Sequence, residues 1–217
     1  MKKSLLVLSS LATICSLNLN ALDLMIGINI KSASIEIDDK KTQDDEIAQM
    51  SNGQQYSPTI GLRTEPQYFS NGNSNWGYFY QFDGTIFQID KQEIDGQDEE
   101  QDLGTSIKGY SLFAVPTGYY HFNKNSNGWS QKVGIGIGAG YLNMSGNFKI
   151  TKQSHPDYGQ IKDVNVKDFG MAVGIFLEFS NKNHSIIIQN FGPTVSDDNY
   201  EYMQHNVDIM YRYKFSL

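Results

Sequence analysis

The stretch that most constrains this chain is its end, residues 207–217. Every second position there is apolar or aromatic: Val207, Ile209, Tyr211, Tyr213, Phe215 and Leu217. The positions between them are Asp208, Met210, Arg212, Lys214 and Ser216. Such alternation is typical of a β-strand with two unlike faces, because successive side chains point to opposite sides. The apolar face of this strand therefore needs an apolar medium, while the opposite face carries two cations and an acid.

The same pattern recurs along the chain and predicts an all-β fold. In the first segment five apolar residues alternate with other residues, namely Leu22, Leu24, Ile26, Ile28 and Ile30. After Ser32 the apolar positions switch to Ala33, Ile35 and Ile37. This switch predicts either a bulge or the point at which the strand leaves its apolar medium, such as a membrane. We expect eight strands, at about 22–37, 56–68, 76–89, 105–122, 129–149, 166–179, 184–191 and 202–217. The alternation leaves the register of the fourth strand open.

The connections between these strands are expected to alternate in length. Four polar segments are long, at about 38–55, 90–102, 150–165 and 192–201, and the connections between them are short and rich in Asn, Ser and Gly. Long loops at one end and short turns at the other, with both termini at the short-turn end, predict an antiparallel up-and-down barrel. The fold expected is thus an eight-stranded transmembrane β-barrel with short periplasmic turns and longer extracellular loops.

The segment 129–149 contains the clearest internal signal. Outward Val133, Ile135, Ile137, Ala139 and Tyr141 alternate with four glycines, Gly134, Gly136, Gly138 and Gly140. Inward glycines suit a narrow barrel whose interior is filled by larger side chains from other strands. A dinucleotide-binding loop is the rival interpretation, but the glycines alternate strictly and no helical pattern follows.

Composition is compatible with lipid as the apolar medium. The mean hydropathy of -0.43 is too polar for a helical membrane protein, whereas a barrel needs apolar residues only at alternate positions.

Residues 1–21 combine Lys2 and Lys3, a short apolar stretch and Ala21, as in a secretory signal peptide cut after Ala21. The two domains expected are this signal peptide and a barrel over 22–217. The single cysteine, Cys15, lies within the signal, so we expect no disulfide. Cleavage would leave 15 basic and 24 acidic residues, a net charge of -9, which makes nucleic acid an unsuitable partner.

Charged and amide side chains on the inward faces predict a polar network inside the barrel. Burying charges is costly unless they pair, and eight strands leave an interior just wide enough for side chains. The residues expected to form this network are Arg63, Gln81, Asp83, Lys132, Glu178, Gln189 and Arg212. A polar path for ions or small solutes is the alternative use of the same residues.

With these patterns established, the chain resembles the small eight-stranded outer-membrane proteins of Gram-negative bacteria, the OmpA-type, OmpX-type and opacity-type barrels. The resemblance covers residues 22–217 and concerns architecture, since it includes no catalytic motif. It implies that the last strand is read by the barrel-assembly machinery, through Tyr211, Tyr213, Phe215 and Leu217. Family members usually end in Phe, whereas Ser216 and Leu217 follow Phe215 here.

Three functions remain open at this stage. The first is a non-enzymatic surface protein with acidic loops, which stabilises the envelope or contacts an extracellular ligand or host surface, with lipid and lipopolysaccharide as neighbours. The second is a narrow, porin-like uptake route. The third is a lipid A-modifying enzyme, for which His184 and Ser185 are the nearest pair, although adjacent strand residues point to opposite faces. We expect no enzyme activity, no cofactor and no metal, because the four histidines lack ligand spacing. The fold rival is a soluble lipocalin-like barrel, with an apolar interior and a polar exterior.

Overall fold

A computed structural model describes residues 22–70, 74–94, 100–123 and 128–216, and within these the side chains of 53, 54, 57, 58 and 216 are not described. The strands are β1 Leu22–Asp39, β2 Asp44–Thr64, β3 Gln67–Tyr68, β4 Trp76–Ile89, β5 Lys91–Gln92, β6 Ile107–Phe122, β7 Ser130–Lys149, β8 Ile161–Asn181, β9 His184–Ser196 and β10 Tyr200–Ser216. The predicted signal peptide and Leu217 lie outside the described residues. No helix in the described part is long and apolar enough to cross a membrane.

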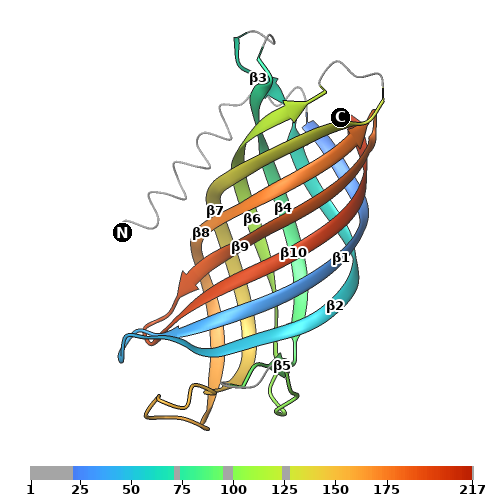
Figure 1. The fold of residues 1–217 in the computed structure, drawn as a ribbon. Helices are drawn as coiled ribbons and strands as arrows, with labels where there is room; N and C mark the ends of the chain where they lie inside the picture. The colour runs from blue at the N-terminus through green and yellow to red at the C-terminus, as the bar shows by residue number, and fades with distance from the viewer. Residues whose placement is uncertain (1–21, 71–73, 95–99, 124–127, 217) are drawn as a thin grey trace.

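The strands form one antiparallel sheet that closes on itself (Figure 1). Their order is β3-β4-β6-β7-β8-β9-β10-β1-β2-β5, and an additional pairing of β4 with β2 completes the ring. β1 pairs with β10 from Asp23↔Ser216 to Asp39↔Tyr200 without a register shift. The first and last long strands therefore lie side by side over their whole length, as their common parity in the sequence predicts.

Two of the four predicted long loops are wrong. Residues 38–55 belong almost entirely to β1 and β2, which leaves only 40–43 as the connection, and β9 and β10 take up most of 192–201. At the other end, β3 follows β2 and pairs with β4 at Gln67↔Tyr78 and Tyr68↔Gly77, so the connections do not alternate between long loops and short turns as expected. The reason is that the outer face of these strand ends is polar. Their sequence therefore lacks apolar residues at the outward positions and resembles that of a loop.

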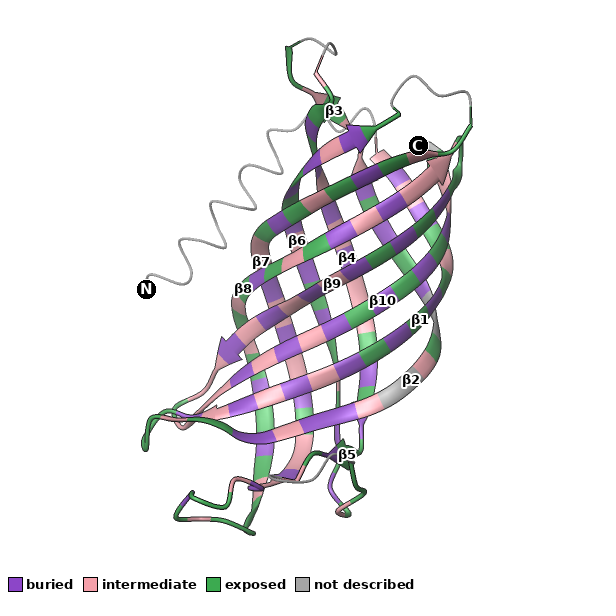
Figure 2. Cartoon of the chain, viewed as in Figure 1, coloured by how far each residue is buried: buried purple, intermediate pink, exposed green. Residues whose placement is uncertain are grey.

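Alternation of burial along each strand separates an inner from an outer face (Figure 2). On β6, whose register the sequence left open, odd-numbered residues such as Phe113 and Val115 are buried, and even-numbered ones such as Leu112 face outward. On β7 the four glycines face inward as predicted. A Cβ on Gly136 would lie 2.4 Å from Val115 Cγ1 and 3.0 Å from Phe191 Cε1, so side chains of other strands fill the space that Gly136 leaves.

Candidate functional site

The outer face of β1 changes character part-way along the strand. Ile26, Ile28 and Ile30 are exposed, whereas the following outward residues are Ser32, Ser34, Glu36 and Asp38. The inner face changes in the opposite sense, from Asn29 and Lys31 to the fully buried Ala33, Ile35 and Ile37. Even-numbered residues face outward along the whole of β1, so the strand does not rotate at Ser32. What changes is the character of the residues on each face. Of the two sequence alternatives at Ser32, a change of medium fits β1; the only irregularity there is a register shift against β2.

The change occurs at the same level around much of the ring. Strand pairing aligns Ile30 with Tyr56 on one side of the barrel and Tyr141 with Phe169 on the other. Beyond this level the outward residues are mostly polar, as Asn143 and Lys167 illustrate, although Ile161 at the start of β8 is also exposed. Aromatic rings mark the level itself, with ring centroids 6.1 Å apart for Tyr110 and Tyr141 and 4.8 Å apart for Tyr141 and Phe169.

A second set of aromatic side chains borders the outer face near the end where the chain terminates. Trp76 packs edge-on against Tyr120 at 5.1 Å between ring centroids, and Tyr213 against Phe215 at 4.7 Å. Trp129 is also exposed there. Between the two aromatic borders the exposed residues are mainly aliphatic, among them Ile26, Ile28, Val133, Ile135, Ile137, Val173, Ile175, Ile186, Ile188, Val207 and Ile209. We call this surface the apolar belt.

The interior beyond the belt is an apolar core. Its fully or almost fully buried members are Ala33, Ile35, Ile37, Ile47, Ala48, Met50, Phe87, Ile89, Ile107, Leu142, Met144, Phe148, Ile150, Val164, Val166, Val195 and Tyr202. Together with the polar outer face, this arrangement is that of a water-soluble β-barrel. The end of the molecule opposite the chain termini is therefore built for water. We call it the outer extension.

Within the belt, Arg212 of β10 reaches across the interior to β2 and β4. Its guanidinium donates to both carboxylate oxygens of Asp83, at 2.7 and 3.2 Å, and to Thr59 Oγ1 at 2.8 Å. Only 1% of Arg212 and 7% of Asp83 are exposed. This is a bidentate, buried ion pair, in which each charge depends on the other because water does not surround either of them.

A second ion pair lies nearer the end where the chain terminates. Glu178 accepts hydrogen bonds from Arg63 at 2.5 Å and from Lys132 at 3.0 Å, and Arg63 also lies over the ring of Phe79 at 4.2 Å. Gln81 connects the two ion pairs, since it accepts from Arg63 at 3.0 Å and donates to Asp83.

Gln81 also donates to Gln189 Oε1 at 3.0 Å. The structure thus brings all seven residues of the expected network together, buried on the inner face. An apolar, mainly aromatic cluster flanks this network and consists of Phe79, Phe113, Val115, Tyr119, Ala172, Phe176 and Phe191.

Sequence reasoning missed part of this interior. Asn29 donates to Asp208 at 2.6 Å, and Lys31 donates to Thr85 Oγ1 at 2.8 Å. Thr59, the third partner of Arg212, was also overlooked. Strand parity could have identified these residues, because Asn29 and Lys31 alternate with outward isoleucines and Asp208 alternates with Val207 and Ile209.

The pairing of β2 with β4 is the shortest side-by-side contact between long strands. Its described ladder contains three residue pairs, from Gly61↔Asp83 to Arg63↔Gln81. β4 and β6, in contrast, pair continuously from Trp76↔Tyr120 to Ile89↔Ile107. Arg212 donates hydrogen bonds to Thr59 on β2 and to Asp83 on β4. These side-chain hydrogen bonds hold the two strands together where backbone pairing is short. We call this contact the β2–β4 seam.

At the tip of the outer extension, the segment 150–160 docks on the β1–β2 connection. His155 Nε2 lies 3.1 Å from Asp39 Oδ2, and the backbone N–H groups of Thr151 and Lys152 donate to the carbonyl of Ile47. Burial opposes the charged form of Asp39, but hydrogen bonds from the Lys41 N–H and from His155 outweigh it and hold the pKa of Asp39 below its usual value.

The outer face of β1 carries like charges at this end. Partial burial raises the pKa of Glu36, and the neighbouring carboxylates of Asp38 and Glu46 raise it further. His205, with Nε2 3.9 Å from Glu36 Oε2, acts in the opposite direction. Partial burial and like-charge repulsion together therefore disfavour the ionised form of Glu36 in the folded protein.

The candidate catalytic pair is not brought together. His184 is exposed, with Nδ1 2.6 Å from the Tyr211 hydroxyl, whereas Ser185 is buried and donates to Glu178 at 3.3 Å. Among the described residues no group of three or more His, Cys, Asp or Glu is placed to hold a metal ion.

Comparison with known proteins gives similar structures but no family match. No family model matches the sequence, and no curated protein matches it. The attachment invasion locus protein Ail of Yersinia pestis is 17% identical, with 87% of this chain and 98% of that chain covered and a TM-score of 0.35. Neisserial surface protein A is 11% identical, with 88% and 97% covered and a TM-score of 0.41. The outer membrane protease OmpT of Escherichia coli is 11% identical, with 93% and 98% covered and a TM-score of 0.40.

These similar structures are outer-membrane β-barrel proteins, the class that the sequence pattern resembles. At these identities and TM-scores the likeness is one of fold alone.

Proposed function

We propose that the protein is an eight-stranded, up-and-down β-barrel of the bacterial outer membrane, with a closed interior and an acidic outer extension that acts as an interaction surface. The observation that carries the proposal is the inversion of both faces at one level, where the outside changes from apolar to polar and the inside changes in the opposite sense. Outside the β2–β4 seam, the closed sheet satisfies its backbone hydrogen bonds by pairing between neighbouring strands, as strands in lipid require. Aromatic borders above and below an aliphatic zone are typical of such barrels.

Strand lengths support a projection into water. A tilted strand needs about 9–11 residues to cross a bilayer. β2 and β8 have 21 residues each, so about ten residues of each extend further, or roughly 30 Å along the strand. A soluble lipocalin-like barrel is disfavoured because the belt would then expose its aliphatic residues to water.

The contents of the interior favour a closed barrel over a channel. Inside the belt the ion pairs of Asp83 and Glu178 occupy the cross-section together with aromatic side chains, and the apolar core fills the outer extension. Eight strands leave little room beyond such side chains. We expect refolded protein in planar bilayers to give no stepwise conductance. Regular steps that change on replacing Arg212 would favour the porin-like alternative.

In this proposal the extension carries the function. Its outer face and tip present Glu36, Asp38 and the exposed acids Asp90, Glu93, Glu100 and Asp102 to the outside, for contact with an extracellular ligand or a host surface. The belt residues of β10, Tyr211, Tyr213 and Phe215, would serve as the signal for the barrel-assembly machinery, together with Leu217. A lipid A-modifying activity is disfavoured by the separation of His184 from Ser185, and an unchanged lipid A profile in cells that express the protein would exclude it.

Single cysteines on β1 test the membrane assignment. The only cysteine of the sequence, Cys15, lies in the predicted signal peptide, so variants can be labelled at one position. Ile28→Cys and Ser34→Cys are matched because both side chains face outward on the same strand. A membrane-impermeant maleimide should label the Ser34→Cys variant in intact cells, and the Ile28→Cys variant only after the membrane is dissolved and the protein unfolded. Equal labelling of both in cells would refute the membrane location.

A further inference from the structure

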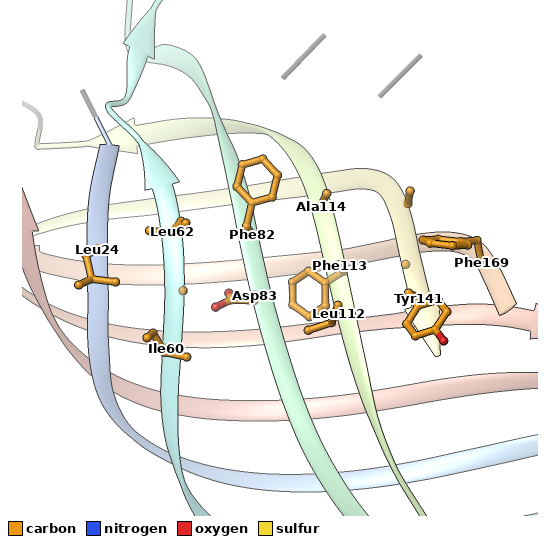
Figure 3. A pocket seen from close by; sticks show the side chains of 13 residues that line it. Leu24, Ile60, Leu62, Phe82, Asp83, Leu112, Phe113, Ala114, Tyr141 and Phe169 are labelled. Atoms are coloured by element: carbon orange, nitrogen blue, oxygen red, sulfur yellow. The ribbon is translucent and has the colours of Figure 1, made fainter. Parts of the chain in front are cut away.

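An apolar hollow of about 630 Å³ lies on the wall where β2, β4, β6 and β7 adjoin (Figure 3). Ala114 and Ala139, which are paired directly on β6 and β7, leave the wall recessed between larger neighbours. The outward side chains around them are Leu24, Ile60, Leu62, Phe82, Leu112, Tyr141 and Phe169. One charged residue contributes to the lining, Asp83, and its carboxylate is already bonded to Arg212 inside the barrel. The hollow therefore suits a hydrocarbon chain.

Two exposed lysines lie just beyond the hollow, on the side of the outer extension. Lys167 is the next outward residue after Phe169 on β8, and Lys108 lies two outward positions beyond Leu112 on β6. Lys108 pairs with Ser145 of β7 and Lys167 with Asn143, so two strand spacings of about 4.8 Å and an offset of about 7 Å along β7 separate the two lysine Cα atoms by about 12 Å. The two flexible lysine side chains can therefore contact the same anion.

Carboxylates come one outward position beyond the lysine pair, with Asp90 after Gln88 at the end of β4 and Asp163 beyond Asn165 on β8, so the two lysines are the outward charges nearest the hollow. At the level of the lysines themselves the other outward residues are uncharged. Described outward neighbours there are Gln88 on β4, Asn143 and Ser145 on β7, and Asn165 on β8. Asn143 Nδ2 donates to the Tyr110 hydroxyl at 3.1 Å, which leaves the hydroxyl proton of Tyr110 able to donate to a further acceptor.

The opposite side of the barrel differs, because Glu36 and Asp38 follow Ser34 on β1. The lysine pair is thus a local pair of cations at the edge of the belt, with Asp90 and Asp163 further from the belt, in a protein whose formal net charge is -7.

We propose that the hollow and the lysine pair form one binding site for a membrane lipid with an anionic, phosphate-bearing headgroup. One acyl chain lies in the hollow, and the headgroup phosphate contacts Lys108, Lys167 and the Tyr110 hydroxyl. The geometry matches such a lipid because the apolar and cationic parts meet at the level where the belt ends, and headgroups occupy that level in a bilayer. The site rests on the membrane location proposed above and assigns a specific lipid contact to one face of the belt.

Native mass spectrometry of the folded full-length mature chain tests the site. The protein in detergent is titrated with phosphatidylglycerol and, separately, with phosphatidylcholine of the same acyl chains. The wild type should bind one phosphatidylglycerol molecule more tightly than phosphatidylcholine. Lys108→Gln with Lys167→Gln should weaken phosphatidylglycerol binding by roughly fivefold for each lysine removed, and leave phosphatidylcholine binding unchanged. Lys41→Gln with Lys182→Gln is the matched control, because both of these lysines are exposed and remote from the hollow.

A variant of the hollow separates the acyl-chain contact from the headgroup contact. Ala139→Leu places a larger side chain in the recess and should weaken the binding of both lipids, whereas Thr194→Leu, outward on β9, should not. Equal binding of the two lipids by the wild type, or wild-type affinity in the Lys108/Lys167 variant, would overturn the site. The cysteine labelling pattern on β1 reports membrane insertion separately, so failure of the lipid site leaves the proposed membrane location standing.

Discussion

Replacing Arg212 with Met should be among the most damaging single substitutions inside the barrel. The change removes three hydrogen bonds and leaves the Asp83 carboxylate buried without a cation. Breaking a buried ion pair in this way destabilises proteins by about 3–5 kcal/mol. Lys214→Met provides the matched control on the same strand, because Lys214 is partly exposed and lies 3.4 Å from Asp23. Such a pair contributes about 1 kcal/mol or less.

The assay is equilibrium urea unfolding of the protein in lipid vesicles, followed by the fluorescence of its two tryptophans. A double variant, Arg212→Met with Asp83→Leu, removes both charges and should recover most of the lost stability, since apolar replacement of a buried pair is often neutral or better. Hydrogen exchange adds a local measurement: amides near Gly61 at the β2–β4 seam should exchange faster in Arg212→Met than in Lys214→Met. Equal unfolding midpoints for Arg212→Met and Lys214→Met, or a double variant no more stable than Arg212→Met, would refute the reasoning.

Three further predictions concern the outer extension, the wall and the belt. Glu36→Gln should raise the urea midpoint at neutral pH, because a raised folded-state pKa means that the ionised carboxylate destabilises the fold; the gain should vanish below the ordinary value of 4.5, and a gain that persists there would contradict the assignment. Gly138→Ala should reduce folding yield, since its Cβ would lie 2.1 Å from a backbone oxygen of β6, whereas Gly118→Ala meets nothing within 4 Å; equal yields in a gel-shift folding assay would contradict this. Tyr211→Asp should block insertion by placing an acid on the belt, whereas the inward Met210→Gln should insert, and equal surface expression of the two would mean that the faces are misassigned.

Strands that lie largely within the belt were predictable from sequence. The segment expected at 129–149 is β7 at Ser130–Lys149, and the one expected at 105–122 is β6 at Ile107–Phe122. Both contain the outward apolar alternation that lipid requires. The segments 38–55 and 192–201 were misjudged because their apolar residues, such as Ile47 and Val195, face inward while the outer face is polar. A search for an apolar outer face therefore stops where the belt ends, although the strand continues.

The members of the interior network were predictable, but their pairing was not. Parity places Arg212 and Asp83 on inner faces, since each alternates with outward apolar residues. Their contact joins β10 to β4, which are not neighbours in the ring, and depends on how the closed barrel brings distant walls together. Sequence alternation contains no information on that distance. The same limit explains why Thr59, the third member of this contact, was not anticipated.

The short β2–β4 ladder is supported by contacts on either side of it, and these contacts keep the ring closed at the seam. Toward the end where the chain terminates, pairing continues up to Arg63↔Gln81. In the outer extension, β2 pairs with β5 at Met50↔Gln92, and the Met50 side chain is buried in the apolar core. In the outer extension, the hydrophobic effect stabilises the end of the seam near Met50, because water surrounds that part of the barrel. A wall that faces lipid does not have this contribution, and there Arg212 stabilises the end of the seam near Gly61. The two halves of the barrel stabilise the same weak contact by opposite means, so the polar network and the apolar core are both needed to hold the outer extension in a fixed position relative to the belt.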